Sequence, residues 1–391
     1  MTAHGAHDPG GAAEASRAPH EAHVRLARAF SSVFLIGPPM GEELVHIVSH
    51  LFTHEEAAVA ARVPYYLPRS ARTIARRVGR PVAEVAPLLD AMAARRVIVG
   101  TRRGYALIPL IPGMFEYMLM PGEASDWHRT YGDLISRLFE SGFTREYSTA
   151  AMPAIRTISV QKTVEGKSHV VDADLVSRMI DAHEDLAVAK VCQCRQSARF
   201  SGRECARSAP EDGCLIFGAF AASAAGNGSA RRVSRDEMRA IVDDRWKKRL
   251  IFFAGNVDPA SPNAICTCCD CCCHYVEAIT RYGAMATLSP PHYIALVDEA
   301  RCTDCGLCVP ACNTRAHTLV AKKHGYDASR CVGCGLCVDA CRRGAVTMAV
   351  NPSYRRPSRS FPRLMLRLAP AIFVSGLRVL IRRRRTAPNE A

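Results

Sequence analysis

The sequence predicts an α+β protein of several domains, and three observations lead to this fold class. Between residues 40 and 110, apolar residues recur at helical spacing and then alternate. Ten of the eighteen cysteines lie between residues 192 and 273. The other eight form one spacing that occurs twice between residues 302 and 341. With 391 residues, 48% of them hydrophobic, the chain is long enough for two or three domains with their own cores.

These patterns divide the chain into five parts. We expect a disordered N-terminus (1–22), a helical domain ending in a hairpin (23–120), a cysteine-rich α/β middle domain (121–290), a domain built on the repeated cysteine spacing (291–351) and a basic amphipathic tail (352–391). The first part is rich in Gly, Ala and His, which is typical of a solvated terminus. The four histidines of this region are expected to be solvated rather than metal ligands: His4, His7, His20 and His23.

Four segments define the helical domain. "GEELVHIVSHLF", "RSARTIARRVG" and "PVAEVAPLLDAMAARRV" predict three helices, and "VIVGTRRGYALI" predicts a hairpin that turns at Gly104. Three helices followed by a hairpin resemble a winged-helix domain. The resemblance implies a winged-helix-like fold for residues 23–120.

Many winged-helix domains bind DNA, and the third helix bears on that function. Its apolar face is expected to pack inward (Val82, Val85, Leu88, Leu89 and Met92). The opposite face is small and acidic (Ala83, Glu84, Ala86, Pro87, Asp90 and Ala94), whereas a helix that contacts bases usually offers Arg, Asn or Gln. Six arginines remain available for phosphates: Arg69, Arg72, Arg76, Arg77, Arg102 and Arg103. A scaffold or partner-docking role is favoured over DNA binding.

Residues 111–190 carry no chemical signature. Within them "DADLVSRMIDAHEDLAVAK" predicts one helix with an apolar inner face formed by Leu175, Met179, Ile180 and Leu186. His183 is expected on the surface of this helix.

The repeated spacing is the strongest signal in the chain. "CTDCGLCVPAC" and "CVGCGLCVDAC" both follow C-x2-C-x2-C-x3-C. Three thiolates at this spacing can bind three corners of one iron–sulfur cube, and Gly306, Gly333 and Gly335 let the loops approach it closely. A pair of zinc sites is disfavoured, because zinc sites are usually built from isolated cysteine pairs.

This stretch resembles the bacterial two-cluster [4Fe–4S] ferredoxins over residues 292–350. The resemblance implies that one cluster is held by Cys302, Cys305, Cys308 and Cys341, and the other by Cys331, Cys334, Cys337 and Cys312. It also implies that "HYIALVD" and "GAVTMAV" pair as strands. A proline usually follows each fourth cysteine, but here Asn313 and Arg342 do. We expect this departure to alter local packing or potential rather than to remove a cluster.

Ten cysteines remain, and the sequence leaves their partition open. They are Cys192, Cys194, Cys205, Cys214, Cys266, Cys268, Cys269, Cys271, Cys272 and Cys273. The first four lie close enough in sequence to close a tetrahedral site, for iron–sulfur or for zinc. The last six cannot all face one metal, because neighbouring side chains diverge. Two four-ligand centres, one larger cluster or a thiol redox patch are all open, whereas haem attachment is excluded by Asp270 at the required cysteine position.

The order of these parts resembles a larger family of predicted multi-cluster iron–sulfur proteins of anaerobic metabolism, over roughly residues 110–350. That family joins a C-x-C…C…C stretch, a run similar to C-N-C-C-x-C-C-C and a two-cluster ferredoxin. Here Thr267 replaces the more usual Asn. The resemblance implies one or two additional iron–sulfur centres (or zinc) but no particular reaction.

Compartment and charge bear on possible partners. Dense cysteine without a secretory-signal pattern predicts a reducing, cytoplasmic location. Of the formal net charge of +14, the last 41 residues hold ten arginines against one acid, Glu390. Residues 361–385 predict a basic amphipathic helix that Pro370 kinks or splits. This tail suits the inner face of an anionic membrane, contacted peripherally, or an acidic partner.

The combined prediction is an electron carrier. Two [4Fe–4S] clusters, with further cysteine-bound centres, would relay single electrons to or from a partner oxidoreductase. One alternative is a redox-sensing winged-helix transcription regulator, and a second is a reductase with a catalytic iron–sulfur centre in the middle domain. No nucleotide cofactor is expected, since neither G-x-G-x-x-G nor a P-loop occurs.

Overall fold

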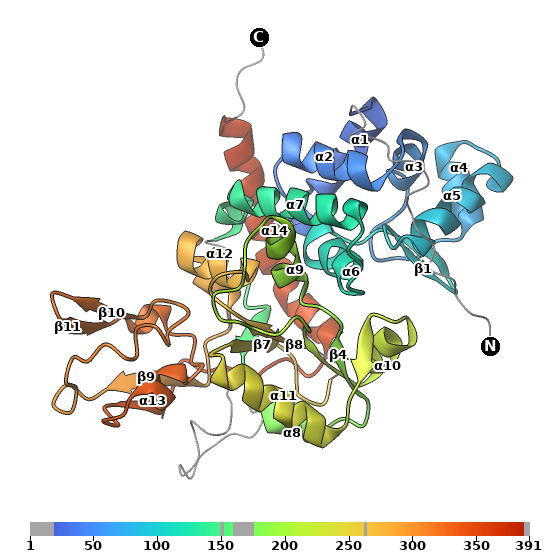
Figure 1. The fold of residues 1–391 in the computed structure, drawn as a ribbon. Helices are drawn as coiled ribbons and strands as arrows, with labels where there is room; N and C mark the ends of the chain where they lie inside the picture. Colours follow the sequence, from blue (N-terminus) through green and yellow to red (C-terminus); the bar gives the residue numbers. More distant parts are fainter. Residues whose placement is uncertain (1–18, 149–151, 159–175, 262–263, 387–391) are drawn as a thin grey trace. The chain divides into compact units, whose positions relative to one another are not determined.

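The computed structural model describes residues 19–148, 152–158, 176–261 and 264–386 (Figure 1). Its chain forms two compact units. Unit 1 contains the described residues up to Leu119 together with Glu123–Phe143. Unit 2 contains Met120–Gly122 and the described residues from Thr144 onward.

Unit 1 is helical with one hairpin. Its elements are α1 (Glu21–Phe30), α2 (Glu42–Leu51), α3 (His54–Ala60), α4 (Ala71–Val78), α5 (Val82–Ala94), β1 (Val99–Thr101), β2 (Gly104–Ala106), α6 (Phe115–Leu119) and α7 (Asp126–Glu140). The three predicted helices correspond to α2, α4 and α5, and the predicted hairpin is the antiparallel pair β1–β2. Helices α1, α3, α6 and α7 were not predicted, and assignment of the unit to the winged-helix class stays a prediction.

The ordered chain begins before residue 23, where the sequence predicted a disordered end. His20 caps α1 by accepting a hydrogen bond from the backbone N–H of Ala22. His23 is buried on α1, with its Nε2 2.9 Å from the carbonyl oxygen of Phe52. These two histidines are therefore structural, while His4 and His7 lie outside the described residues. At the other end, α7 joins unit 1 by packing on α2, so the unit extends past the predicted boundary at residue 120.

The third predicted helix, α5, buries most of its expected inner face. Val85, Leu89 and Met92 are buried, but Val82 in its first turn is 40% exposed. On the outer face Glu84, Pro87, Asp90 and Ala94 are exposed, as expected. Arg80, just before α5, pairs with Glu84 and with Glu55, so its charge is already balanced.

The middle of unit 2 is a six-stranded sheet in the order β3-β7-β8-β5-β4-β6. The strands are β3 (Ile155–Thr157), β4 (Leu186–Ala189), β5 (Leu215–Phe217), β6 (Ala230–Arg232), β7 (Ile251–Gly255) and β8 (Ala264–Cys268). All five ladders are antiparallel. The domain is therefore α+β rather than the predicted α/β, because its strands pair without parallel crossover units. Its helices are α8 (Val176–Asp181), α9 (Gln193–Phe200), α10 (Ala219–Gly226), α11 (Arg235–Lys247) and α12 (His274–Tyr282).

The helix predicted before residue 190 is shorter than expected. Helix α8 ends at Asp181, and the "LAVA" segment is strand β4, paired with β5 and β6 and fully buried. His183, predicted at the surface, is buried, and its Nδ1 lies 2.9 Å from the carbonyl oxygen of Met179. Leu175 lies outside the described residues.

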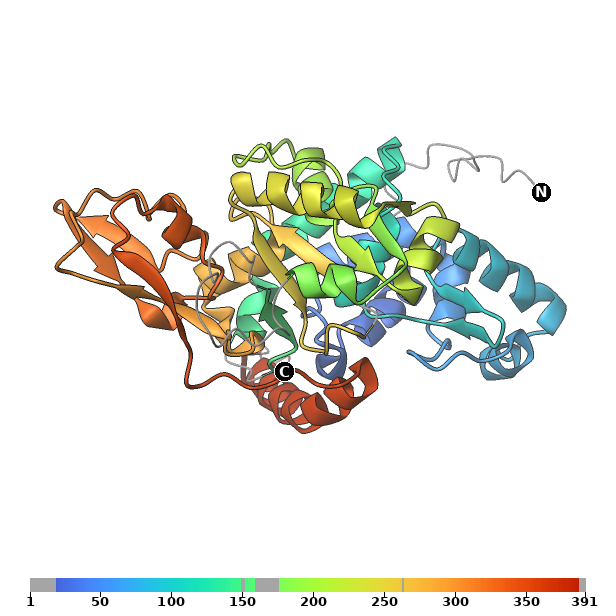
Figure 2. The same ribbon diagram turned by 90° about the horizontal axis from the view of Figure 1, so that it is seen from below.

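The ferredoxin-like part (residues 291–351) is built on two hairpin-like pairs (Figure 2). Strand β9 (Tyr293–Val297) pairs with β12 (Val346–Val350), so the predicted strand pairing is present. Strands β10 (His317–Val320) and β11 (Lys323–Tyr326) form the second pair. Helix α13 (Leu336–Ala340) carries the third cysteine of the second motif and ends just before the fourth.

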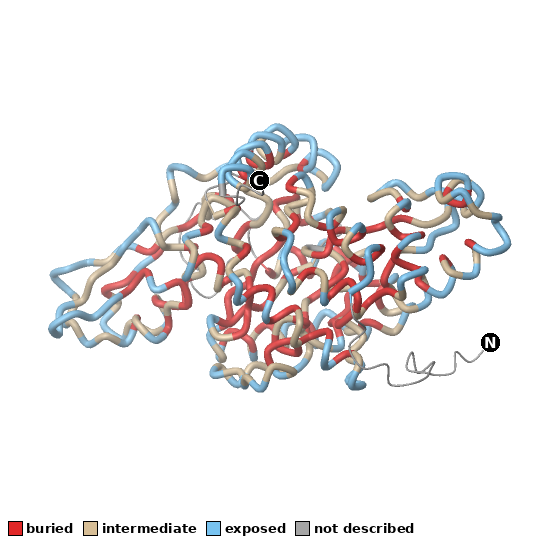
Figure 3. The backbone as a smooth tube through the Cα atoms, turned by 90° about the horizontal axis from the view of Figure 1, so that it is seen from above, coloured by how far each residue is buried: buried red, intermediate tan, exposed pale blue. Residues whose placement is uncertain are grey.

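The tail forms one helix, α14 (Phe361–Thr386), which continues through Pro370 instead of splitting there. Leu364 and Leu368 pack with Val257, and Arg383 forms an ion pair with Glu146 (Nη2–Oε2 2.5 Å). Much of the rest of the helix is exposed (Figure 3, beside the C-terminus). Among the described residues, α14 is the one helix that is long enough and apolar enough to cross a membrane, judged by length and composition alone. Core helices of soluble proteins also pass this test.

Candidate metal centres

The eight cysteines of the ferredoxin-like part line two cavities. Cavity A is lined by Cys302, Cys305, Cys308 and Cys341, and cavity B by Cys312, Cys331, Cys334 and Cys337. Each cavity thus collects three cysteines of one motif and the fourth of the other. Pairing of β9 with β12 closes the chain on itself, which brings the end of the second motif back to the start of the first.

Glycines keep the cysteine loops close to the rest of this part. Gly333 has φ of +73°, and a Cβ there would lie 2.1 Å from the carbonyl oxygen of Tyr293. Gly306 has φ of +72°, and its Cβ would lie 2.9 Å from the Leu319 side chain. The backbone conformation therefore favours glycine at both positions, and at Gly333 the backbone carbonyl also leaves no space for a side chain.

Two histidines connect the cavities. His317 lines cavity B and His324 lines cavity A, and their Nδ1 and Nε2 atoms lie 2.9 Å apart. The Nδ1 atom of His324 lies 3.9 Å from the Sγ atom of Cys302. These contacts are satisfied together when His317 donates to His324 and His324 donates to the sulfur. Burial, and after it the neighbouring His324, lower the pKa of His317 to about 4, which keeps the ring neutral.

The middle-domain cysteines meet at one edge of the six-stranded sheet. Strand β4 ends just before Cys192, β5 begins just after Cys214, and β8 ends at Cys268. Since neighbouring strands are antiparallel, these three ends lie at the same edge. The loop from β8 to α12 supplies four more cysteines, which lie between Cys268 and the first residue of α12.

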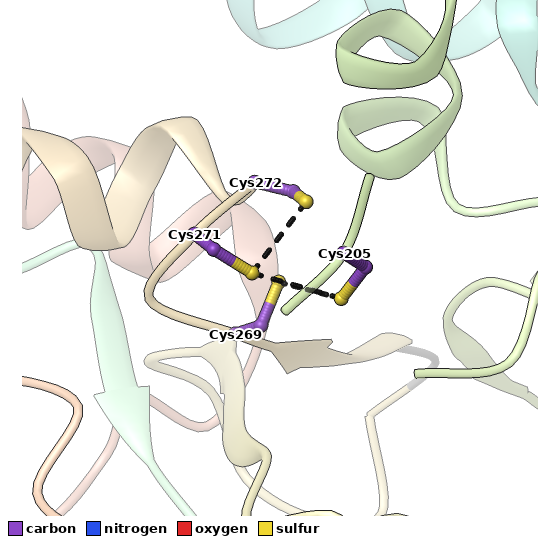
Figure 4. Close-up of side chains that lie close together, drawn as sticks. All are labelled: Cys205, Cys269, Cys271 and Cys272. Carbon is purple, nitrogen blue, oxygen red and sulfur yellow. Dashed lines mark hydrogen bonds between the residues drawn. The ribbon is translucent and has the colours of Figure 1, made fainter. Parts of the chain in front are cut away.

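Four of these thiols form a compact group, the four-thiol site (Cys205, Cys269, Cys271 and Cys272; Figure 4). All four sulfurs lie within 4.8 Å of one another. The Cys205–Cys271, Cys271–Cys272 and Cys205–Cys269 sulfur distances are 3.6, 3.7 and 3.8 Å. A tetrahedral ion with metal–sulfur bonds of about 2.3 Å separates its ligand sulfurs by about 3.8 Å. The spacing therefore fits one metal ion, whereas a cube of four irons holds its thiolates farther apart.

The other six thiols form a continuous series of neighbours, the six-thiol row, in the order Cys192, Cys194, Cys273, Cys268, Cys266 and Cys214. Each contacts the next, and the Cys214 and Cys266 sulfurs lie 3.5 Å apart. Contact with Cys194 lowers the pKa of Cys192 to about 7, and contacts with Cys194 and Cys268 lower the pKa of Cys273 well below its usual value. The thiol of Cys214 at one end also interacts with that of Cys192 at the other, so the six thiols together can surround a centre of several metal ions.

The sequence allowed a single tetrahedral site formed by Cys192, Cys194, Cys205 and Cys214. The structure does not bring these four thiols together. Cys194 lies in the first turn of α9, and the helix carries the chain roughly 9 Å along its axis before the loop that contains Cys205. Cys205 therefore joins the loop after β8, and the other three stay with the sheet edge.

Two buried arginines accompany these thiols, and the sequence analysis missed both. Arg195 donates to the carbonyl oxygens of Thr267 and Asp212, and Arg245 donates to Gly213 O and to the hydroxyl of Thr267. Arg245 also pairs with the Asp212 carboxylate at 3.0 Å. Burial alone would lower the pKa of Arg195, but nearby thiolates raise it overall. Two buried cations with one carboxylate need further negative charge, which thiolates bound to a metal would supply.

The ferredoxin-like part is attached beside these centres. Arg207 forms a two-point ion pair with Asp270 (2.8 and 2.9 Å) and donates to the carbonyl oxygen of Pro310 at 2.8 Å. Asn313 is buried and its Nδ2 donates to the carbonyl oxygen of Arg249 at 2.8 Å. Proline, the residue usual at this position in the resemblance, has no such donor. The departure from the pattern thus has a structural role.

The core is continuous across this junction. Val332 and Leu336 of the ferredoxin-like part are buried in the same hydrophobic cluster as Cys268 and Cys273, and Cys334 packs against it. Cavity B therefore lies on the side of the ferredoxin-like part that packs against the core of the middle domain. In cavity A, by contrast, Cys305 is exposed.

Residues 301–345 match the family model of the 4Fe-4S dicluster domain. No curated protein and no solved structure matched the chain. The matched residues carry all eight cysteines of cavities A and B. The chain thus contains a 4Fe-4S dicluster domain, together with clustered cysteines that can hold further metal.

Proposed function

We propose that the protein relays single electrons between a partner oxidoreductase and a cysteine-bound centre in its middle domain. The observation that carries this proposal is the crosswise lining of cavities A and B, which supports one [4Fe–4S] cluster in each. The shared core of Cys334, Cys268 and Cys273 supports electron transfer onward from cavity B to the six-thiol row.

The outer end of this route is cavity A. Leu307 lines cavity A and is 38% exposed, and Leu319 and Val320 near the same loop are also exposed. A small apolar surface beside an exposed cluster ligand suits transient docking of a redox protein. We assign this surface to the partner oxidoreductase.

We also propose that α14 contacts an anionic membrane surface. Its outer side exposes Leu366, Phe373, Val374, Leu377 and Ile381, while its inner side packs on unit 2. Arg363, Arg367, Arg378 and Arg382 are exposed along the same helix. Apolar side chains with flanking arginines match the interface of an anionic bilayer, where the rings and chains enter the headgroup region and guanidiniums bind phosphate.

The regulator alternative receives less support, because the outer face of α5 is small and acidic and Arg80 is already paired. Salt-dependent DNA binding that changes with the oxidation state of the protein would favour it.

The deciding experiment is anaerobic purification followed by measurement of iron, acid-labile sulfide and zinc per chain, with EPR of the reduced protein. The proposal predicts about eight irons from cavities A and B, further iron from the six-thiol row, and one metal ion at the four-thiol site. Coupled signals beyond those of two [4Fe–4S]⁺ centres are expected. About eight irons and EPR signals from two clusters alone would remove the middle domain from the relay.

A further inference from the structure

A cavity lined by charged residues lies against both cysteine groups of the middle domain. Its wall includes Cys271 and Cys272 of the four-thiol site and Cys273 of the six-thiol row. Its volume is about 330 Å³, against about 20 Å³ in each of cavities A and B. This volume falls at the lower end of the range of small-molecule sites, so the cavity is larger than coordination of a metal requires.

Three arginines reach this cavity from three separate segments. Arg203 comes from the loop after α9, Arg281 from α12, and Arg315 from the ferredoxin-like part. Segments so distant in sequence place guanidinium groups together only through the tertiary fold. Guanidinium groups bind planar carboxylates and other oxyanions through paired hydrogen bonds.

The acidic residues of the wall do not cancel this charge. Asp270 is held by the two-point ion pair with Arg207, which does not line the cavity. Glu277 pairs with Arg281 at 3.0 Å, and contacts with His274 and then Arg281 lower its pKa. The wall thus carries three arginines against two carboxylates, and its other ionisable groups are the thiols of the three cysteines.

We propose that this cavity binds a small carboxylate, held by Arg203 and Arg315, beside the sulfurs of Cys271, Cys272 and Cys273. A ligand there contacts ligand residues of both metal groups, so its binding changes their electronic environment. The proposal concerns binding, and it does not depend on the electron relay: binding can be measured on protein in any oxidation state.

The test is calorimetric titration of the anaerobically purified full-length protein with succinate, and separately with inorganic phosphate, at constant ionic strength. We expect saturable binding of one succinate per chain and a change in the visible or EPR spectrum on binding. Arg315→Ala is expected to weaken binding by about tenfold or more, as loss of a charge-assisted pair does. Thr280→Phe, which fills the cavity without changing its charge, is expected to abolish binding.

Arg359→Ala is the matched control, because it removes an equal charge from an exposed position of unit 2 that does not line the cavity. Metal content and circular dichroism establish that each variant is folded. Equal weakening by Arg359→Ala and Arg315→Ala, or succinate binding that survives Thr280→Phe, overturns the site. Binding of phosphate without succinate overturns the carboxylate assignment. Loss of the relay signals with succinate binding intact would instead overturn only the proposed function.

Discussion

Asn313 and Thr267 both depart from the residues usual in the patterns that the chain resembles, and both have a specific contact. Asn313 donates to the Arg249 carbonyl, and the Thr267 hydroxyl accepts a hydrogen bond from buried Arg245. Neither contact could be predicted from spacing, because each partner lies on a distant segment. The substitutions are therefore informative about the junction and the six-thiol row rather than about the ligands themselves.

Asn313→Leu is expected to loosen the junction without removing the clusters of cavities A and B. The change leaves the Arg249 carbonyl, which lies in a partly buried contact, without its donor, at a cost of about 1 kcal/mol. Hydrogen exchange at the amides of Arg249 and Leu250 should become faster, with iron content unchanged. Asn351→Leu is the control, since Asn351 donates to Pro291 within the ferredoxin-like part. Loss of about four irons in Asn313→Leu would show that the side chain supports a cluster directly.

His324→Leu is expected to lower the reduction potential of the cluster in cavity A. A donor to a ligand sulfur stabilises the more negative reduced state, so its removal favours the oxidised state by a shift of tens of millivolts or less. An EPR-monitored redox titration measures this, and the cluster in cavity B is the internal control. A larger shift at cavity B would assign the effect to His317 instead.

His50 predicts a pH dependence for unit 1. Burial lowers its pKa, although the carbonyl oxygen of Trp127, 2.9 Å from its Nε2, acts in the opposite direction. The folded state therefore binds fewer protons than the unfolded one near pH 6.5, so stability is full above that pH and falls as the pH is lowered further. His50→Gln should reduce this loss between pH 7.5 and 5.5 by roughly 1 kcal/mol.

Urea unfolding followed by Trp127 fluorescence in a Trp246→Phe background measures the effect, because these are the two tryptophans of the chain. His46→Gln, on the same helix, is the control. An unchanged pH dependence in His50→Gln would mean that other groups dominate it.

At the scale of elements, the sequence correctly predicted the helices and the hairpin that depend on local patterns alone. Helices α2, α4 and α5 and the β1–β2 hairpin follow from periodicity within single segments. The "LAVA" segment was predicted as helix, because its strand state depends on β5 and β6, which follow it in the chain. Its four buried residues are apolar on both sides, a pattern that a buried helix and an interior strand share.

Helix α14 carries the prediction that belongs to this scale. Replacing Leu366, Phe373 and Leu377 by serine should reduce binding to vesicles containing anionic lipid by about tenfold or more, since the exposed apolar side chains supply the insertion energy. Cosedimentation with such vesicles, compared with vesicles of neutral lipid, measures this. The control is a triple serine variant at exposed Leu67, Val82 and Phe220, which lie outside α14. Equal loss in both variants would argue against a dedicated membrane face.

At the scale of the whole molecule, each group of cysteines is formed by segments that lie far apart in the sequence. The two ferredoxin-like motifs could be grouped by resemblance, because their spacing is characteristic. The ten remaining cysteines could not, because their grouping depends on which strand ends share a sheet edge and on how far α9 carries Cys205 from Cys194. The role of Arg245 could not be predicted either, because its helix carries no other functional signal and its contact with Thr267 depends on the tertiary fold.

The partition into a four-thiol site and a six-thiol row predicts separable losses of metal. Cys269→Ser with Cys272→Ser should remove one metal ion per chain, which we expect to be zinc, and leave sulfide unchanged, because a single ion with four thiolates needs no inorganic sulfide. Cys268→Ser with Cys273→Ser, in the six-thiol row, should instead lower iron and sulfide together. These pairs lie within six consecutive residues, so a nonspecific effect on the loop would give the same losses in both. Loss of one metal ion in the first variant, and of iron with sulfide in the second, follows only if neighbouring cysteines face two different centres.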